Sequence, residues 1–446
     1  MNIIQEFDTI AAISTPLGYG GVGVVRVSGD KSLDIIGKIF KGQKIENHKI
    51  SHGYIKDGEK FLDEVIVLYF QNPQSYTGED VIEIQCHGGV NIVKNILNLV
   101  LKTGARMAER GEFTKRAFLN KKLDLSQAEA VCDLIHSKCD NFSTGAVKNL
   151  QGKLSEKIYE IKKEVFDILS KIIAGIDFPD EVAEPEYSYL IETFKSIIKE
   201  IEEILKSSNT SNILRQGIKV AIVGKPNVGK SSVFNSLLNI DRAIVTNIAG
   251  TTRDVLHETL DLGIPVTLID TAGIRDENSK DVDKVEEIGI NYSKQSIEQA
   301  DLSLFVYDIN QGLQDEDKMI LDLLENKKHL VIANKIDLNN KKDENVYNIS
   351  AETKEGIEEL KEAIKNIVCE ISPENLEYVT NSRQTTCLQR AKEALEQALI
   401  SSTEEQIQDL ISIDVKQALL CLDEVTGEVI TDDILNNIFE HFCIGK

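Results

Sequence analysis

Short apolar runs open the chain and predict strands. Runs rich in β-branched residues lie at 10–14, 22–27, 65–70 and 81–84, and a loop with several glycines separates the first two. Apolar residues at helical spacing follow over 92–101. Strands and helices mixed in this way predict an α+β domain over residues 1–118.

Beyond Leu125 the apolar positions recur at helical spacing. Ser126 and Glu129 match the capping-box pattern and predict the start of a helix there. One apolar stripe over 147–172 predicts a single long helix, roughly 40 Å at ~1.5 Å per residue. The polar segment 207–212 is expected to be a linker.

A third region alternates strands with helices. Its apolar runs at 218–223, 266–269, 302–307 and 330–333 predict a doubly wound α/β sheet with helices on both faces. Helical stripes return after residue 373, so this unit is expected to interrupt an all-α domain. The predicted fold class is therefore multidomain α/β. The expected division is into segments 1–118, 119–212, 213–371 and 372–446.

Composition places the chain among folded cytoplasmic proteins. It is 41% apolar and 28% charged, and no apolar run reaches the ~18–20 residues that span a membrane. The N-terminal residues carry Glu6 and Asp8 but no basic residue, unlike a targeting signal. The seven cysteines are scattered without a C-x-x-C pair, which favours reduced thiols. We expect a cytoplasmic location and no membrane association.

Charge is distributed unevenly. The net charge is −23, which by itself disfavours a dedicated nucleic-acid binder, yet residues 1–120 carry 14 basic and 14 acidic side chains. A basic stretch, defined here as 102–122, holds Lys102, Arg106, Arg110, Lys115, Arg116, Lys121 and Lys122. It is either a phosphate-binding surface or a solvated face.

The segment Gly224–Ser231 carries the clearest chemistry. Its sequence, GKPNVGKS, fits the phosphate-binding pattern G-x-x-x-x-G-K-S between a predicted strand and a predicted helix. Main-chain N–H groups there bind phosphate, the lysine neutralises it, and the serine hydroxyl is a Mg²⁺ ligand. The expected nucleotide-binding residues are Asn227, Val228, Gly229, Lys230, Ser231 and Ser232.

Three later segments indicate that the nucleotide is GTP. A magnesium- and γ-phosphate-contacting segment is expected at Asp270, Thr271, Ala272 and Gly273. A base-reading segment is expected at Asn334, Lys335 and Asp337, with a further base contact at Ser350 and Ala351. The Asp337 carboxylate can accept two hydrogen bonds from guanine, and adenine lacks that donor pair, so discrimination of ~10⁴ or more is possible.

The region between these segments is expected to act as a switch. Thr252 is the residue expected to complete the magnesium shell while the γ-phosphate is present. Ile274 stands where many GTPases carry a water-orienting glutamine, so a different residue must orient the water, or hydrolysis is slow. Pattern alone leaves the acidic candidates open: Asp276, Glu277, Asp281, Asp283, Glu286 and Glu287.

The chain resembles the MnmE (TrmE) family of bacterial tRNA-modifying GTPases along essentially its whole length. The resemblance rests on the runs 20–29, 76–80, 83–89, 111–113, 118–120 and 123–125, the GTP motifs, and the ending Cys443-Ile444-Gly445-Lys446. The GTP motifs are shared with many GTPases, whereas the N-terminal runs and the ending are more specific. The resemblance implies an inserted P-loop GTPase domain and an N-terminal domain similar to folate-binding domains.

The resemblance also implies a reaction and partners. With an FAD-containing partner, MnmG, in a heterotetramer or larger assembly, such a protein adds a carboxymethylaminomethyl or aminomethyl group to C5 of the tRNA wobble uridine. A 5-formyl- or methylene-tetrahydrofolate supplies the one-carbon unit. Arg26, Glu83, Lys122 and Lys446 match the family's folate contacts. Cys443 is implied near the reaction, although a buried structural thiol is the plainer interpretation.

For the GTPase, the resemblance implies a homodimer in which K⁺ replaces an arginine finger. Asn227, Thr246, Ile248 and Thr251 match the potassium site, and Glu286 matches the residue that orients the attacking water. The loop around this site adds nucleotide contacts at Thr246, Asn247, Ile248, Ala249, Gly250, Thr251 and Thr252.

Two other functions fit the GTP motifs. One is a ribosome-assembly GTPase that binds rRNA, although no RNA-binding module is recognisable after the GTPase segment. The other is a nucleotide-switched scaffold without further chemistry. Folate binding and loss of the modified uridine would separate both from the first hypothesis.

Overall fold

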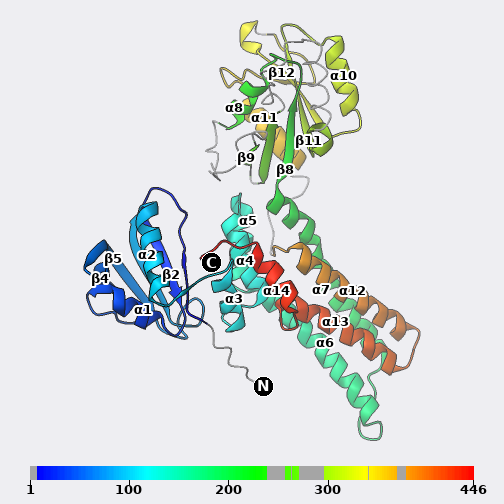
Figure 1. Ribbon diagram of the computed structural model, residues 1–446. Helices are drawn as coiled ribbons and strands as arrows, with labels where there is room; N and C mark the ends of the chain where they lie inside the picture. Colours follow the sequence, from blue (N-terminus) through cyan, green and yellow to red (C-terminus); the bar gives the residue numbers. More distant parts are fainter. Residues whose placement is uncertain (1–7, 239–256, 263, 271–295, 340, 369–377) are drawn as a thin grey trace. The chain divides into compact units, whose positions relative to one another are not determined.

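The computed structural model describes residues 8–238, 257–262, 264–270, 296–339, 341–368 and 378–446. Many of their helices and strands are labelled in Figure 1. The residues fall into two compact units. The first unit contains residues 1–132, 149–197 and 390–446, and the second contains residues 133–148 and 198–389.

The first unit contains a seven-stranded sheet in the order β3-β4-β5-β6-β2-β1-β7. Its neighbouring strands are antiparallel except for β1 and β7, which are parallel. The strands are β1 (Ile10–Ile13), β2 (Gly20–Ser28), β3 (Phe40–Gly42), β4 (Ile50–Asp57), β5 (Lys60–Phe70), β6 (Val81–Gly88) and β7 (Arg106–Met107). Helices α1 (Ser32–Ile39) and α2 (Val90–Thr103) share an apolar core with the sheet.

All four predicted strands of this region are present. Strand β4 was not predicted from the apolar pattern. Its buried positions are Ser51, Gly53 and Ile55, so two of the three inward residues carry little apolar surface.

Helices make up the rest of the first unit. Two of them, α6 (Lys153–Asp177) and α13 (Gln408–Thr426), pack along each other. Ile158, Val165 and Ile172 of α6 and Val415 and Leu422 of α13 are fully buried. The remaining helices, some of which continue into the second unit, are α3 (Glu112–Leu119), α4 (Leu125–His136), α5 (Asp140–Leu150), α7 (Tyr187–Gln216), α12 (Ser382–Thr403) and α14 (Asp432–Glu440).

Three expectations about these helices were wrong. The capping box at the start of α4 joins Asp124 and Gln127: the Gln127 main-chain N–H donates to Asp124 Oδ1 at 2.9 Å, and the Asp124 N–H donates to Gln127 Oε1 at 3.0 Å. Ser126 is instead buried inside the helix and donates to the Val425 carbonyl.

The single long helix predicted over 147–172 is two helices, α5 and α6. Gly152 (φ 92°) lies between them in the left-handed region, which ends one helix and begins the next. The expected linker at 207–212 lies inside α7. There Ser207 and Ser211 hydroxyls donate to the carbonyls of Ile204 and Ser207, so these serines bond within the helix rather than forming turns. The predicted boundary at 212/213 therefore falls within a helix.

The second unit contains a six-stranded sheet in the order β13-β12-β11-β8-β10-β9. All neighbouring strands are parallel except β9 and β10. Its elements are β8 (Ile218–Val223), α8 (Lys230–Leu238), β9 (His257–Asp261), β10 (Pro265–Asp270), β11 (Leu302–Asp308), α10 (Asp315–Leu324), β12 (His329–Asn334), the 3₁₀ helix η1 (Ile336–Leu338), β13 (Tyr347–Asn348) and α11 (Ile357–Val368).

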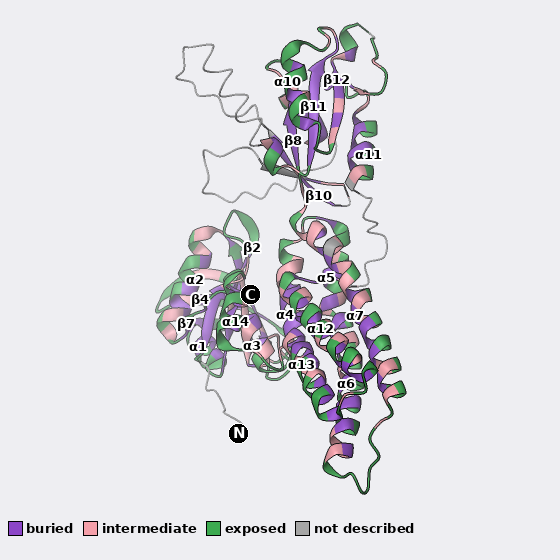
Figure 2. Ribbon diagram, turned by 90° about the vertical axis from the view of Figure 1, so that its right-hand side faces the viewer, coloured by how far each residue is buried: buried purple, intermediate pink, exposed green. Residues whose placement is uncertain are grey.

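Helices cover both faces of this sheet. Val220 and Ile222 of β8 share a core with α8 and α11, whereas Ala221 and Val223 face α10. The buried strands stand out in Figure 2. The predicted α/β sheet with its four strands is confirmed. Within the described residues, no helix is long and apolar enough to cross a membrane.

Candidate functional site

The loop between β8 and α8 holds the predicted phosphate-binding residues. Its main chain enters the left-handed region at Asn227 (φ 65°) and Gly229 (φ 96°). A Cβ atom at Gly229 would lie 2.3 Å from Asn334 Nδ2, so this close approach requires glycine. Turns of this kind direct successive N–H groups into one concave surface that binds anions. The loop fits the role of a phosphate site.

Two lysines of the loop are held differently. Lys230 Nζ donates to the carbonyl oxygens of Gly224 (2.8 Å) and Lys225 (2.7 Å), so its ammonium group lies over the loop. Lys225 Nζ instead lies 2.9 Å from Asp317 Oδ2 and donates to Gln314 Oε1 at 2.7 Å, at the start of α10. Lys230 is therefore the lysine that lies over the loop.

Two hydrogen bonds join the predicted base-reading residues to the loop, and a third joins two of these residues to each other. Asn334 Nδ2 donates to the Val228 carbonyl (2.9 Å), and Asn334 Oδ1 accepts from the Ala351 N–H (3.1 Å). Lys335 Nζ donates to the Asn227 carbonyl at 2.8 Å. Segments more than a hundred residues apart thus meet at the ends of parallel strands, where α/β sheets bind ligands.

The remaining predicted nucleotide contacts are partly described. Ser231 and Ser232 are exposed in the first turn of α8, Asp337 is exposed in η1, and Ser350 is fully buried beside Ala351. Asp270 ends β10. Ten other predicted contacts lie outside the described residues, as does Glu286: Thr246, Asn247, Ile248, Ala249, Gly250, Thr251, Thr252, Thr271, Ala272 and Gly273.

A second polar site lies on the sheet of the first unit. Arg26 of β2 and Glu83 of β6 are register partners, and Arg26 Nε donates to Glu83 Oε1 at 2.9 Å. The Arg26 guanidinium also lies over the rings of Tyr76 (5.5 Å) and Phe113 (5.7 Å). The pair is only partly buried, so it can contact a ligand.

The end of the chain reaches this pair. The Gly445 carbonyl accepts from Arg26 Nη1 (3.2 Å) and from Ser14 Oγ (3.1 Å). A β-bridge between Arg110 and Ile444 also holds this segment. Gly445 (φ 96°) approaches strand β1 so closely that a Cβ atom would lie 2.3 Å from the Ile13 carbonyl oxygen.

The two predicted tail residues differ in exposure. Burial, followed by the nearby charge of Arg26, lowers the pKa of the half-buried Lys446 ammonium. Cys443 is exposed, so a buried structural thiol, the plainer interpretation of the sequence, was wrong.

Lys122, the fourth predicted folate contact, is exposed and bonds to a different residue. Its Nζ donates to the Pro73 carbonyl at 3.0 Å. Among the described residues no hydrogen bond or ion pair joins Lys122 to Arg26, Glu83 or Lys446. Arg26, Glu83 and Lys446 thus interact with one another, and Lys122 stays a predicted folate contact.

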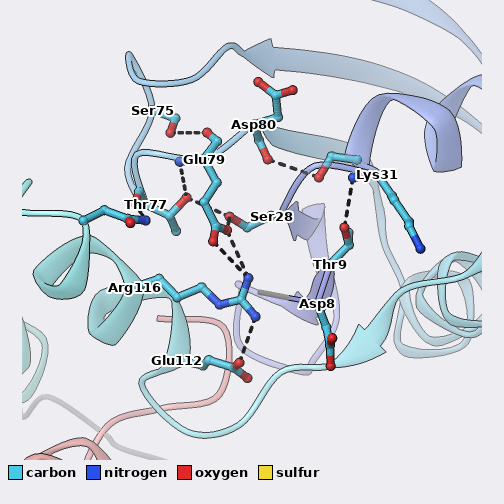
Figure 3. A network of polar contacts seen from close by, with 12 residues as sticks. Asp8, Thr9, Ser28, Lys31, Ser75, Thr77, Glu79, Asp80, Glu112 and Arg116 are labelled. Atoms are coloured by element: carbon cyan, nitrogen blue, oxygen red, sulfur yellow. Dashed lines mark hydrogen bonds and ion pairs between the residues drawn. The ribbon is translucent and has the colours of Figure 1, made fainter. Parts of the chain in front are cut away.

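A buried ion network underlies this sheet (Figure 3). Arg116 donates to both carboxylate oxygens of Glu79 and to Glu112 Oε1, each at 3.1 Å. Ser28 Oγ donates to Glu79 Oε2 at 2.7 Å, and Arg106 pairs with Glu112 at 2.7 Å. Arg106 and Arg116 are therefore engaged by carboxylates, and the basic stretch 102–122 offers less positive surface than its composition suggested.

Comparison with known proteins agrees with these features. A family model described as the MnmE helical domain matches residues 125–443, and one described as the GTP-binding protein TrmE N-terminus matches residues 9–122. A tRNA modification GTPase MnmE of Thermoanaerobacter sp. (strain X514) is 46% identical and covers 99% of this chain and 100% of its own length. Its namesake in Clostridioides difficile (strain 630) is 44% identical over 98% of this chain and 99% of its own length.

Among solved structures, the G domain of the T. maritima FeoB iron transporter is 31% identical. It covers 34% of this chain and 98% of its own length, with a TM-score of 0.26, so the assignment stands on the full-length relatives. The chain belongs to the MnmE family of tRNA modification GTPases.

Proposed function

We propose that this chain hydrolyses GTP to GDP and phosphate as part of a tRNA modification reaction. The observation that supports the GTP site is the pair of bonds from Asn334 and Lys335 to the phosphate loop, together with the bond from Ala351 to Asn334. These bonds support a single site made of the proposed base-reading and phosphate-binding segments. The relatives that span the whole chain are named tRNA modification GTPases.

Guanine recognition is assigned to Asp337. Its side chain is exposed, two residues after Lys335, which contacts the loop. A guanine base would donate its N1–H and N2–H₂ groups to this carboxylate. Adenine would leave the carboxylate without those donors, which is the basis of strong discrimination.

Cation sites are proposed for the same loop. The exposed Ser231 hydroxyl suits Mg²⁺, a hard cation that prefers oxygen ligands, and Thr252 is its proposed second protein ligand. Asn227, Thr246, Ile248 and Thr251 are the proposed K⁺ ligands. When bound, K⁺ would neutralise charge that develops between the phosphates, where an arginine finger contributes ~10³–10⁵ in rate. Glu286 is proposed to orient the attacking water, in place of the glutamine that Ile274 replaces.

A folate one-carbon carrier is proposed for the site at Arg26 and Glu83. A carboxylate can accept from pterin N–H groups, and cationic side chains such as Arg26, Lys446 and Lys122 can pair with a glutamate tail. The support is that Arg26, Glu83 and the chain's end at Gly445 and Lys446 meet at one place. The exposed thiol of Cys443 lies in the same short tail and is proposed to act in the reaction.

The proposal extends to architecture and partners. Residues 1–118 would form a folate-binding-like, dimerising domain, and 213–371 a GTPase domain inserted into a discontinuous helical domain of 119–212 and 372–446. The active assembly would be a cytoplasmic homodimer that works with an FAD-containing MnmG-type protein on tRNA. The modification would be carboxymethylaminomethyl or aminomethyl at C5 of the wobble uridine.

One pair of measurements tests the proposal. GTP hydrolysis by the full chain is measured in KCl and in NaCl at equal ionic strength, and we expect much faster hydrolysis in KCl. Nucleosides of tRNA from a strain lacking the gene are then analysed by mass spectrometry, and we expect loss of the modified wobble uridine. Equal rates in the two salts would remove the potassium claim, and intact tRNA nucleosides would favour the rRNA-binding alternative.

A further inference from the structure

Asp308 is connected to the phosphate loop through Lys335. It is the last residue of β11 and is 6% exposed. Its Oδ2 accepts from Lys335 Nζ at 2.9 Å, and its Oδ1 accepts from the main-chain N–H (2.9 Å) and the Nδ2 (3.1 Å) of Asn310. No role was predicted for Asp308 from the sequence, because it is part of none of the GTP-binding motifs.

The Asp308 carboxylate is held in its charged form. Burial by itself would raise its pKa, but the hydrogen bonds from Lys335 and Asn310 outweigh burial and leave the pKa below its ordinary value. A charged acceptor also strengthens the bond that Lys335 donates. The Asp308 carboxylate therefore stays negatively charged at neutral pH.

Lys335 is fixed at both ends. Its ammonium group bridges Asp308 and the Asn227 carbonyl, at 2.9 Å and 2.8 Å. Its own carbonyl accepts from Asn310 Nδ2 at 3.1 Å, while its main chain lies in the left-handed region (φ 67°). Without Asp308, the ammonium group would lose one partner and the side chain would gain rotational freedom, which weakens the remaining bond to Asn227.

We propose that Asp308 is a positioning residue that, through Lys335, fixes the main chain at Asn227 and couples the base-reading segment to the phosphate loop. Asn227 is the proposed potassium ligand, so the part of this inference that concerns potassium rests on the proposed function. The part that concerns nucleotide affinity stands on the contacts among Asp308, Lys335 and Asn227.

The test compares three variants of the full chain. Asp308→Asn keeps the shape and an acceptor but removes the charge, and Asp308→Ala removes both. Tyr307→Phe is the matched control, because the Tyr307 hydroxyl at the preceding position donates to Asp343 (2.6 Å) rather than to Lys335. For each variant we would measure GDP affinity by fluorescence titration, the ratio of hydrolysis rates in K⁺ and Na⁺, and the melting temperature.

Asp308→Ala should weaken GDP binding about tenfold or more and lower the K⁺/Na⁺ rate ratio, because a hydrogen bond to a charged group is lost. Asp308→Asn should fall between Asp308→Ala and wild type, and Tyr307→Phe should match wild type in both functional measurements. The inference would be overturned if the Asp308 variants had a lower melting temperature but unchanged GDP affinity and an unchanged K⁺/Na⁺ rate ratio. The control can also have a lower melting temperature, so that measurement alone decides nothing. Equal wild-type rates in K⁺ and Na⁺ would refute the potassium proposal instead, and GDP affinity would still decide the role of Asp308.

Discussion

Arg26 and Glu83 face each other across β2 and β6, with 2.8 Å between Arg26 Nη2 and Glu83 Oε1. The same guanidinium donates to the carbonyl of Gly445, so one side chain joins the sheet to the end of the chain. A ligand that binds Glu83 would therefore lie close to the C-terminal tail.

This arrangement predicts the effect of neutralising Glu83. Glu83→Gln keeps the shape of the side chain but removes the charge that ligand N–H groups and Arg26 contact. We expect isothermal titration with 5-formyl-tetrahydrofolate to show affinity at least about tenfold weaker, as for loss of a charge-assisted hydrogen bond. The matched control is Glu64→Gln, which alters an exposed contact with His52 on the same sheet. Equal affinities in the two variants would contradict the assignment.

Local patterns predicted what depends on local geometry. The glycines, the asparagine and the lysine of the phosphate loop lie within one segment of eight residues, and the strand before it is mostly apolar. Both the loop and the strand were therefore predictable. The base-reading segment follows a strand in the same way. Parallel strands bring such segments to one edge, which explains why Asn334 reaches Val228.

Contacts set by the tertiary fold were not predictable. Glu79 and Arg116 are 37 residues apart, and nothing in either segment indicates that they pair. In the sequence, Arg116 counted toward a basic surface, whereas in the structure it is buried against carboxylates. Asp308 is a similar case, because its role depends on Lys335 lying at the end of the neighbouring strand. The spacing of apolar residues does not locate the first residue of a helix to within two positions, so it did not distinguish a cap at Asp124 from one at Ser126.

Gly229 provides a second prediction. Gly229→Ala places a Cβ atom 2.3 Å from Asn334 Nδ2 in a left-handed backbone, so the bond between Asn334 and the Val228 carbonyl must break. We expect binding of fluorescent GDP to fall below detection. Gly312→Ala is the control, because Gly312 also has a positive φ (67°) but a Cβ atom there would have no neighbouring atom within 4 Å. Comparable loss in both variants would attribute the effect to backbone strain alone.

Glu112 predicts a pH dependence of local stability. Burial tends to raise its pKa, but Arg106, the Glu109 N–H and Arg116 together lower it below its ordinary value of 4.5. A lowered folded-state pKa stabilises the fold above about pH 4.5, and this stabilisation is lost as the pH falls through the folded-state value.

Hydrogen exchange of the α3 amides, measured by mass spectrometry, tests this dependence. Glu112→Gln should speed exchange at pH 7, since breaking a buried ion pair costs about 3–5 kcal/mol. The difference from wild type should shrink as the pH falls below 4.5. The control Glu59→Gln alters a fully exposed side chain and should leave exchange of α3 unchanged. A difference that stays constant with pH would show that the charge of Glu112 is unimportant.

Cys443 predicts selective thiol chemistry at the end of the chain. Its side chain is exposed, whereas burial raises the pKa of Cys86 and of Cys139 to about 11. Because the thiolate is the reactive form, iodoacetamide at pH 7.5 should modify Cys443 at least about tenfold faster than either buried thiol. Mass spectrometry of digested protein gives the three rates.

Prior addition of 5-formyl-tetrahydrofolate should slow modification of Cys443 but not of the partly exposed Cys132, because the tail contacts Arg26. Unchanged modification of Cys443 in a protein that binds the folate would place this thiol away from the ligand.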